Sequence, residues 1–125
     1  MALRDEICQA MENYLLNAPS DWNTITTDQL AKAIEAGEKL LVLDVREPDE
    51  FASGHIEGAV NLSVRQLPRR VGELPHDKSL KIVAYCASGI RSAYATMFLR
   101  TYGYEDVRTL AHGVQAWVDA GNRLV

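Results

Sequence analysis

The sequence has few cysteines, no long apolar run and no excess of basic residues, and each shortage argues against a class of protein. Only Cys8 and Cys86 are cysteines among 125 residues, too few for the disulfide framework of small secreted domains. Lys and Arg total 13 against 17 Asp and Glu, a net charge of -4, which argues against general binding to nucleic acid or anionic membranes. No segment approaches the length of a membrane span.

The N-terminus also lacks the apolar core of a secretory signal, because acidic residues recur throughout residues 1–16. We therefore expect a cytoplasmic protein, or a periplasmic one if a signal segment before Met1 has been removed. With 47% hydrophobic residues, a chain of this length is expected to form one core. The expected division is an amphipathic helix and linker over residues 1–19 and one domain over residues 20–125.

Strand-like and helix-like patterns alternate along this domain. Residues 40–45 and 81–85 are almost continuously apolar, which is typical of strands buried on both faces of a parallel sheet. Shorter strands are expected near residue 24, at 59–62 and at 105–110, and residues 65–79 are expected to form a short helix plus loop. Helical segments between the strands predict an α/β fold with helices on both faces of the sheet.

The N-terminal segment has helical spacing of its apolar residues. We expect this stripe to pack on the domain's own sheet layer or on a second subunit, so that the protein is a monomer or a homodimer through this helix. Cys8 borders the stripe, and we expect a packing role for it rather than that of a resolving thiol. The stripe consists of Leu3, Ile7, Met11, Tyr14 and Leu15.

The segment CASGIRS joins a predicted buried strand to a predicted helix from Ser92. Function gathers at the carboxyl ends of parallel strands, and Cys86 lies there. Loop N–H groups and the helix N-terminus would converge on one point, where they favour an anion and lower a thiol pKa. The alternative is a small buried residue that closes a strand. The combination with Gly89, Arg91 and Ser92 favours the functional interpretation.

Lowering a thiol pKa from about 8.5 by two units raises the thiolate fraction at neutral pH roughly 25-fold. The same shift lowers intrinsic nucleophilicity by about 8-fold, so the net gain is only about threefold. We therefore expect substrate positioning and stabilisation of negative charge to be the larger contributions of such a loop.

Three ordered segments, DVREPDEFASGHIEGAVNLS, YCASGIRS and LAHGVQAW, are similar to successive signatures of the rhodanese (sulfurtransferase) family. The resemblance covers nearly the whole chain from Trp22 onward. It implies a rhodanese-like three-layer fold with about five mainly parallel strands, to which the N-terminal helix is an addition. It also implies that Cys86 carries sulfur and that the substrate cradle consists of Ala87, Ser88, Gly89, Ile90, Arg91 and Ser92.

The resemblance implies an enzyme of the thiosulfate sulfurtransferase type that works through a Cys86 persulfide. The donor would be a small sulfur-containing anion such as thiosulfate, polysulfide or a persulfide. The acceptor would be cyanide or a thiol, including a thioredoxin-like or other protein thiol. No metal or organic cofactor is expected, because His55, His76 and His112 lack ligand spacing.

Two other functions share features with this motif. Cysteine-dependent phosphatases and arsenate reductases use a similar loop of the form CxxxxxR, with five residues between the cysteine and the arginine. Only four residues separate Cys86 from Arg91. A shorter loop suits a single sulfur better than a tetrahedral phosphate. A non-enzymatic persulfide carrier or a regulatory binding module remains the third alternative, although such modules often lack the cysteine.

Other residues near the expected site allow a structural and a functional interpretation. Asp44 and Arg46 lie at the carboxyl end of a buried strand, where Arg46 either pairs with Asp44 or screens an anionic donor. The resemblance implies a double glycine before the last helix, but the first of these two positions is His112. This residue is either a tolerated loop residue or an influence on donor choice and pH dependence. Because Ala87 and Ser88 are neutral, we expect the donor not to be uniquely thiosulfate.

Overall fold

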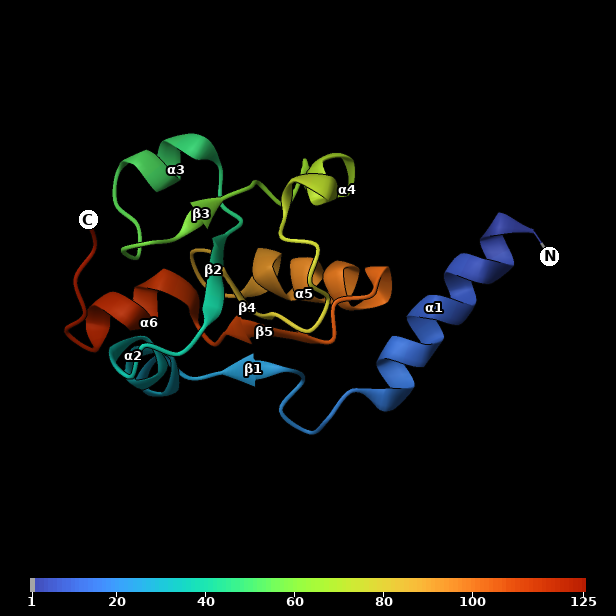
Figure 1. Ribbon diagram of the computed structural model, residues 1–125, viewed down its shortest axis with the longest axis horizontal. Helices are drawn as coiled ribbons and strands as arrows, with labels where there is room; N and C mark the ends of the chain where they lie inside the picture. Colours follow the sequence, from blue (N-terminus) through green and yellow to red (C-terminus); the bar gives the residue numbers. More distant parts are fainter. Residues whose placement is uncertain (1) are drawn as a thin grey trace.

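The strands form one parallel sheet in the computed structural model, which describes residues 2–125. Every pair of neighbouring strands is parallel, and their order is β1-β5-β4-β2-β3. The predicted α/β fold with about five mainly parallel strands and an added N-terminal helix is confirmed (Figure 1). The strands are β1 (Thr24–Ile25), β2 (Leu40–Asp44), β3 (Val60–Asn61), β4 (Lys81–Tyr85) and β5 (Asp106–Leu110).

Helices cover both faces of the sheet and enclose two apolar cores. The helices are α1 (Leu3–Asn17), α2 (Thr27–Glu35), α3 (Pro48–Ala52), α4 (Leu67–Arg70), α5 (Ile90–Tyr102) and α6 (Gly113–Asp119), with a short turn η1 (Val71–Glu73). One core includes side chains of α4, η1 and α5, and the other includes side chains of α2 and α6. No helix among residues 2–125 is long and apolar enough to cross a membrane.

Strand β4 contributes to both cores, because successive side chains of a strand point to opposite faces. Ile82 and Ala84 lie in the core under α5, whereas Val83 and Tyr85 lie in the core under α6. This double burial explains the continuously apolar sequence of residues 81–85.

The carboxyl ends of β2 and β4 lie level with each other. Asp44 of β2 is the register partner of Tyr85 in β4. The segments that follow these two strands therefore begin at the same edge of the sheet, as expected from the sequence.

Helix α5 begins at Ile90, two residues earlier than the predicted start at Ser92. Gly89 precedes it with a φ of 111°, a backbone conformation that residues with a side chain rarely adopt. The chain therefore turns from strand to helix within residues 86–89. This turn is shorter than the sequence pattern indicated.

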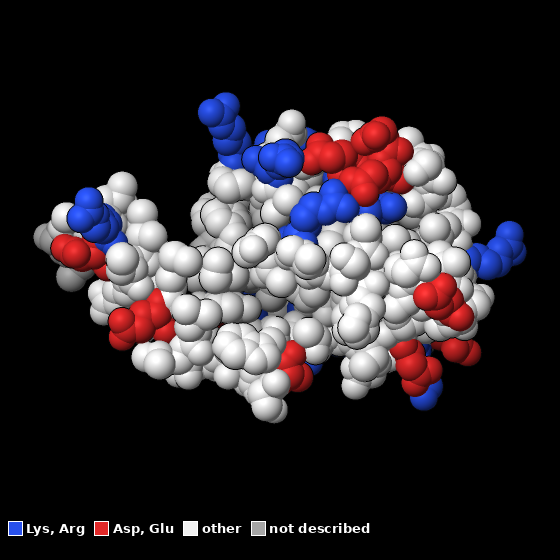
Figure 2. Space-filling view, turned by 180° about the vertical axis from the view of Figure 1, so that it is seen from behind, with Lys and Arg blue, Asp and Glu red and all other residues white. Residues whose placement is uncertain are grey.

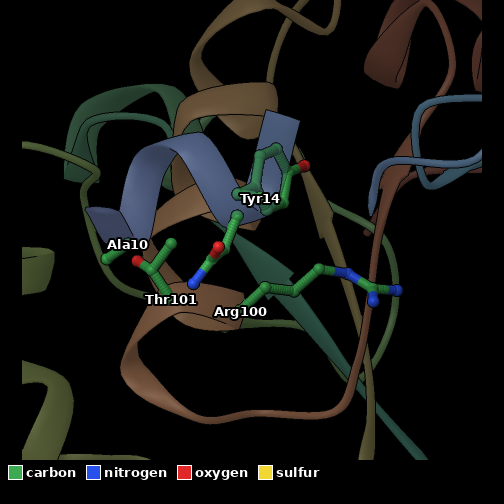
Figure 3. Close-up of a pocket in the computed structure, with 5 residues that line it drawn as sticks. Ala10, Tyr14, Arg100 and Thr101 are labelled. Carbon is green, nitrogen blue, oxygen red and sulfur yellow. The ribbon is translucent and has the colours of Figure 1, made fainter. Parts of the chain in front are cut away.

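Helix α1 packs beside the last turns of α5 and not on the sheet (Figure 1). In Figure 3, Ala10 and Tyr14 of α1 surround a small hollow together with Arg100 and Thr101 of α5. A second, larger groove of about 470 Å³ lies between the same helices and includes Ile7 and Met11 of α1. Because α5 already covers this face of the sheet, α1 can reach only its outer surface.

The apolar stripe of α1 therefore stays exposed, and its predicted burial on the domain's own sheet layer is wrong. Leu3, Ile7, Met11 and Leu15 are 70%, 50%, 41% and 53% exposed. The alternative, in which a second subunit covers the stripe, stays a prediction. Cys8 is also exposed, so the packing role expected for it is wrong in the single chain.

Deleting residues 1–18 tests the contribution of α1. Because no residue of α1 is buried, we expect a loss of about 1 kcal/mol and a fall in melting temperature of roughly 3–6 °C. Light scattering of the full-length and shortened proteins at equal concentration measures whether the stripe also joins two copies. If neither the melting temperature nor the mass per particle changes, α1 is a loose appendage.

Candidate active site around Cys86

Cys86 is the first residue after β4, and its side chain lies inside the turn that leads to α5. The residue is 1% exposed. Its Sγ accepts hydrogen bonds from the N–H groups of Gly89 and Ser92, with N···S distances of 3.1 Å and 3.4 Å. The Ser92 hydroxyl lies 3.6 Å from the same sulfur. The turn therefore forms a cup of polar hydrogens around one sulfur atom.

These contacts change the acidity of the thiol. Burial raises the pKa of Cys86, because it disfavours the thiolate. Hydrogen bonds from the Ser92, Gly89 and Ser88 amides, together with the hydrogen bond between the sulfur and the Ser92 side chain, act in the opposite direction and outweigh burial, so that the pKa lies below the ordinary thiol value. Neutral donors thus stabilise the negative charge on this sulfur.

Helix α6 holds the outer side of the turn. The N–H groups of Val114 and Gln115 donate to the carbonyl oxygens of Cys86 and Ala87 at 2.9 Å and 3.2 Å. A Cβ on Gly113 would lie 2.4 Å from the Cys86 oxygen, so only glycine fits there. Gly113 is not among the site residues expected from the sequence, although a glycine at the start of a helix that closely follows a strand was a usable signal.

Arg91 points its charge toward Glu50 of α3. Its guanidinium donates to both carboxylate oxygens at 2.7 Å and 3.0 Å, and each side chain is 33% exposed. Arg91 lowers the pKa of Glu50 to about 2, so this carboxylate is ionised at neutral pH. The expected loop cation therefore has a protein counter-ion, Glu50, which we did not predict. The acidic segment that follows β2 at the same sheet edge was the available signal.

Arg46 forms a buried ion pair with Asp44. The residue is 6% exposed, and its guanidinium donates to Asp44 at 2.6 Å and to the Gly54 carbonyl at 2.7 Å. It also lies 5.5 Å from the centre of the Tyr85 ring. This geometry favours the structural interpretation of Arg46 over the screening of a donor.

The remaining candidate residues lie on the rim of the cup. Ser88 and Ile90 are exposed, and Ala87 is half-buried. His112 is exposed, precedes α6 with a φ of 60°, and lines a pocket together with Ser88 and Gly89. Among residues 2–125, no group of three or more His, Cys, Asp or Glu side chains is arranged to hold a metal ion.

Cys8 lies far from this cup. Its helix contacts α5 near Met97, Phe98 and Thr101. Cys86 lies beyond the start of α5 at Ile90, which is about 10 Å or more along the helix from these contacts at 1.5 Å per residue. A disulfide needs Cα atoms within about 7 Å. The geometry therefore argues against Cys8 as a resolving thiol within one chain.

Comparison with known proteins points to one family. The model described as a rhodanese-like domain matches residues 26–120. A sulfurtransferase of Allochromatium vinosum is 36% identical over 103 residues, covering 82% of this chain and 94% of that protein. The thiosulfate sulfurtransferase GlpE of Shewanella oneidensis is 34% identical over 101 residues, covering 81% of this chain and 97% of that protein.

The fold comparison agrees. The crystal structure of a rhodanese-related protein from Thermoplasma volcanium superimposes with a TM-score of 0.74 at 32% identity. The superposition covers 82% of this chain and 97% of that one.

The Ser92 hydroxyl offers a test of the cup. In Ser92→Ala, the Cys86 pKa should rise, because one group that stabilises the thiolate is lost, and alkylation by iodoacetamide should begin at higher pH. In the matched variant Ser88→Ala, the pKa should stay unchanged, since only the backbone of Ser88 acts on the sulfur. Alkylation rates measured across pH, in a Cys8→Ser background, give both values. Equal shifts in the two variants would contradict this account of the cup.

Proposed function

The chain belongs to the rhodanese-like domain family, and we therefore propose that it is a sulfurtransferase that carries a sulfane sulfur on Cys86. The observation that supports this most strongly is the sulfur of Cys86 at a strand end, with the N–H groups of Gly89 and Ser92 directed at it. A persulfide is an anion at neutral pH, and it needs the same donors as the thiolate.

In the first half of the proposed reaction, the Cys86 thiolate attacks the outer sulfur of the donor. With thiosulfate, a new S–S bond forms on Cys86, the bond between the two donor sulfurs breaks, and sulfite leaves with the electron pair. Negative charge moves from the thiolate to the added sulfur, so the loop amides that bind the thiolate also lie near the developing persulfide.

In the second half, an acceptor takes the outer sulfur. A thiolate or cyanide attacks this atom, the S–S bond to Cys86 breaks, and Cys86 recovers its electron pair as a thiolate. Neither half needs a metal or an organic cofactor. The reaction needs a reduced Cys86, which fits a reducing compartment such as the cytoplasm. We assign this chemistry to residues 20–125.

We propose that Arg91 attracts the anionic donor to the cup while Glu50 offsets its charge. Because the pair is one-third exposed, an anion that approaches can share the guanidinium with Glu50. Ala87 and Ser88 add no charge to the loop. The loop therefore carries one cation, Arg91, whose charge Glu50 partly offsets. This weak positive charge supports a donor range that includes thiosulfate, polysulfide and organic persulfides.

The length of the loop argues against phosphate-ester hydrolysis. Cysteine-dependent phosphatases are similar in having five residues between cysteine and arginine, whereas four residues separate Cys86 from Arg91. The shorter loop suits a single sulfur better than a tetrahedral phosphate. In a regulatory module without turnover, Cys86 would gain no sulfur from thiosulfate.

Incubation with thiosulfate should add the mass of one sulfur to the Cys86 peptide, and cyanide should remove it. Cys86→Ser should abolish transfer and keep the fold, because a serine hydroxyl stays protonated and does not carry the sulfur. Cys8→Ser is the matched control and should retain at least half of the activity. Mass spectrometry of both peptides, with kcat/KM for each variant, checks this. Label only on Cys8, or full activity in Cys86→Ser, would overturn the proposal.

Variants of Arg91 and Glu50 test whether Arg91 attracts the donor by its charge or only holds the conformation of the loop. Arg91→Ala should lower kcat/KM for thiosulfate at least tenfold, because the donor loses its cation. Glu50→Gln removes the counter-ion but keeps Arg91, so we expect less than a threefold loss. Steady-state kinetics and melting temperatures of both variants provide the comparison. If Glu50→Gln is as damaging as Arg91→Ala, the ion pair shapes the loop and Arg91 does not recruit the donor.

A further inference from the structure

A pocket of about 390 Å³ adjoins the turn that holds Cys86. Its volume lies in the range that holds small organic ligands. It shares a wall with the cup, because Gly89 lines the pocket and also donates its N–H to Cys86 Sγ at 3.1 Å. A molecule whose sulfur lies in the cup can therefore extend into this pocket. The lining residues are Trp22, Thr24, Ser88, Gly89, Ala93, Thr109, Ala111 and His112.

Trp22 leaves much of its large apolar side chain exposed beside this pocket. Trp22 is 57% exposed, whereas Trp117, the other tryptophan, is 6% exposed and lies in the core under α6. Tryptophan at a surface hollow is a frequent binding anchor, because its rigid ring offers a large apolar area and one hydrogen-bond donor.

Backbone strain gathers at the same pocket. Within residues 2–125, the non-glycine residues with positive φ are Trp22 at 55°, Asn23 at 60° and His112 at 60°. Two of these line the pocket, and Asn23 lies between two lining residues. Such conformations cost free energy and cluster where a binding site requires them.

The turn that carries Trp22 is firmly held. Asn23 is 6% exposed, its N–H donates to Asp21 Oδ1 at 3.0 Å, and its carbonyl oxygen accepts from Thr109 of β5 at 2.8 Å. The backbone is thus fixed to the sheet while the indole stays at the surface. A fixed backbone with an exposed aromatic ring is suited to recognition.

The charge of the pocket indicates its occupant. None of its lining residues is Lys, Arg, Asp or Glu. Figure 2 shows that one face of the molecule carries a cluster of both charge signs near its top and a broad central surface with few charged side chains. An inorganic dianion gains little from such a lining. A carbon skeleton with planar amides gains contact with the indole and hydrogen bonds with Ser88 or His112.

We propose that this pocket binds the organic part of a low-molecular-weight, peptide-like persulfide, with Trp22 and His112 as specificity-determining residues. The inference rests on the proposed sulfur transfer and names its donor class. The Cys86 thiolate takes the outer sulfur of the persulfide, the S–S bond of the donor breaks, and the organic thiolate leaves with the electron pair. Thiosulfate uses only the cup.

Donor kinetics test the proposal, with glutathione persulfide and thiosulfate as probes. Trp22→Ala should lower kcat/KM for glutathione persulfide at least tenfold, mainly through KM, and lower kcat/KM for thiosulfate less than threefold. His112→Asn keeps a residue that tolerates positive φ and should shift the donor ratio in the same direction. Tyr102→Ala removes another exposed aromatic side chain, at the far end of α5, and should leave the ratio unchanged. Equal losses for both donors would overturn the proposal.

Binding without turnover separates this proposal from the proposed function. In Cys86→Ser, glutathione should change the tryptophan fluorescence saturably, thiosulfate should not, and Trp22→Phe in the same background should remove the change. If Cys86 forms a persulfide but glutathione gives no saturable change, the pocket assignment fails and sulfur transfer stands. If glutathione binds but Cys86 never gains sulfur, the proposed function fails and the pocket stands as a thiol-binding site.

Discussion

The site depends on the direction of the peptide groups between β4 and α5. For the N–H groups of Gly89 and Ser92 to point at the Cys86 sulfur, the carbonyls of Cys86 and Ala87 face outward. Those carbonyls would be buried without partners, at a cost of roughly 1–3 kcal/mol each, if the first turn of α6 did not donate to them. Gly113 lets α6 approach closely enough. The last helix thus supports the turn at the carboxyl end of β4.

This arrangement stabilises an anion mainly with neutral groups. Arg91 is the cation of the loop, and Glu50 offsets it. A lowered thiol pKa alone increases reactivity only a few fold, because nucleophilicity falls as the thiolate fraction rises. In the proposed transfer, the larger contribution comes from a fixed set of hydrogen-bond donors at the position where charge would move from one sulfur to the next. Because such a cup contacts only the transferred sulfur, we propose that donor selectivity comes from the surrounding surface, including the pocket beside Trp22.

Local patterns predicted the buried strand β4 and the position of Cys86 at its carboxyl end. The apolar run of β4, Cys86 and Gly89 all lie within ten residues of each other. Contacts between distant segments were not predictable in the same way. Glu50 meets Arg91, and Gly113 meets Cys86, only after the strands have paired. The predicted start of α5 was two residues too late, because the positive φ of Gly89 lets the helix begin at the next residue. The burial of the α1 stripe and of Cys8 was wrong because α5 already covers the face on which α1 would dock.

A crystal structure of the protein treated with thiosulfate tests the central claim most directly, since it locates the transferred atom. We expect one added sulfur bonded to Cys86 Sγ, within about 3.5 Å of N–H groups of the turn between β4 and α5, with Arg91 and Glu50 still beside the cup. An unmodified Cys86 in a sample that has released sulfite, or an added sulfur on Cys8, would contradict it.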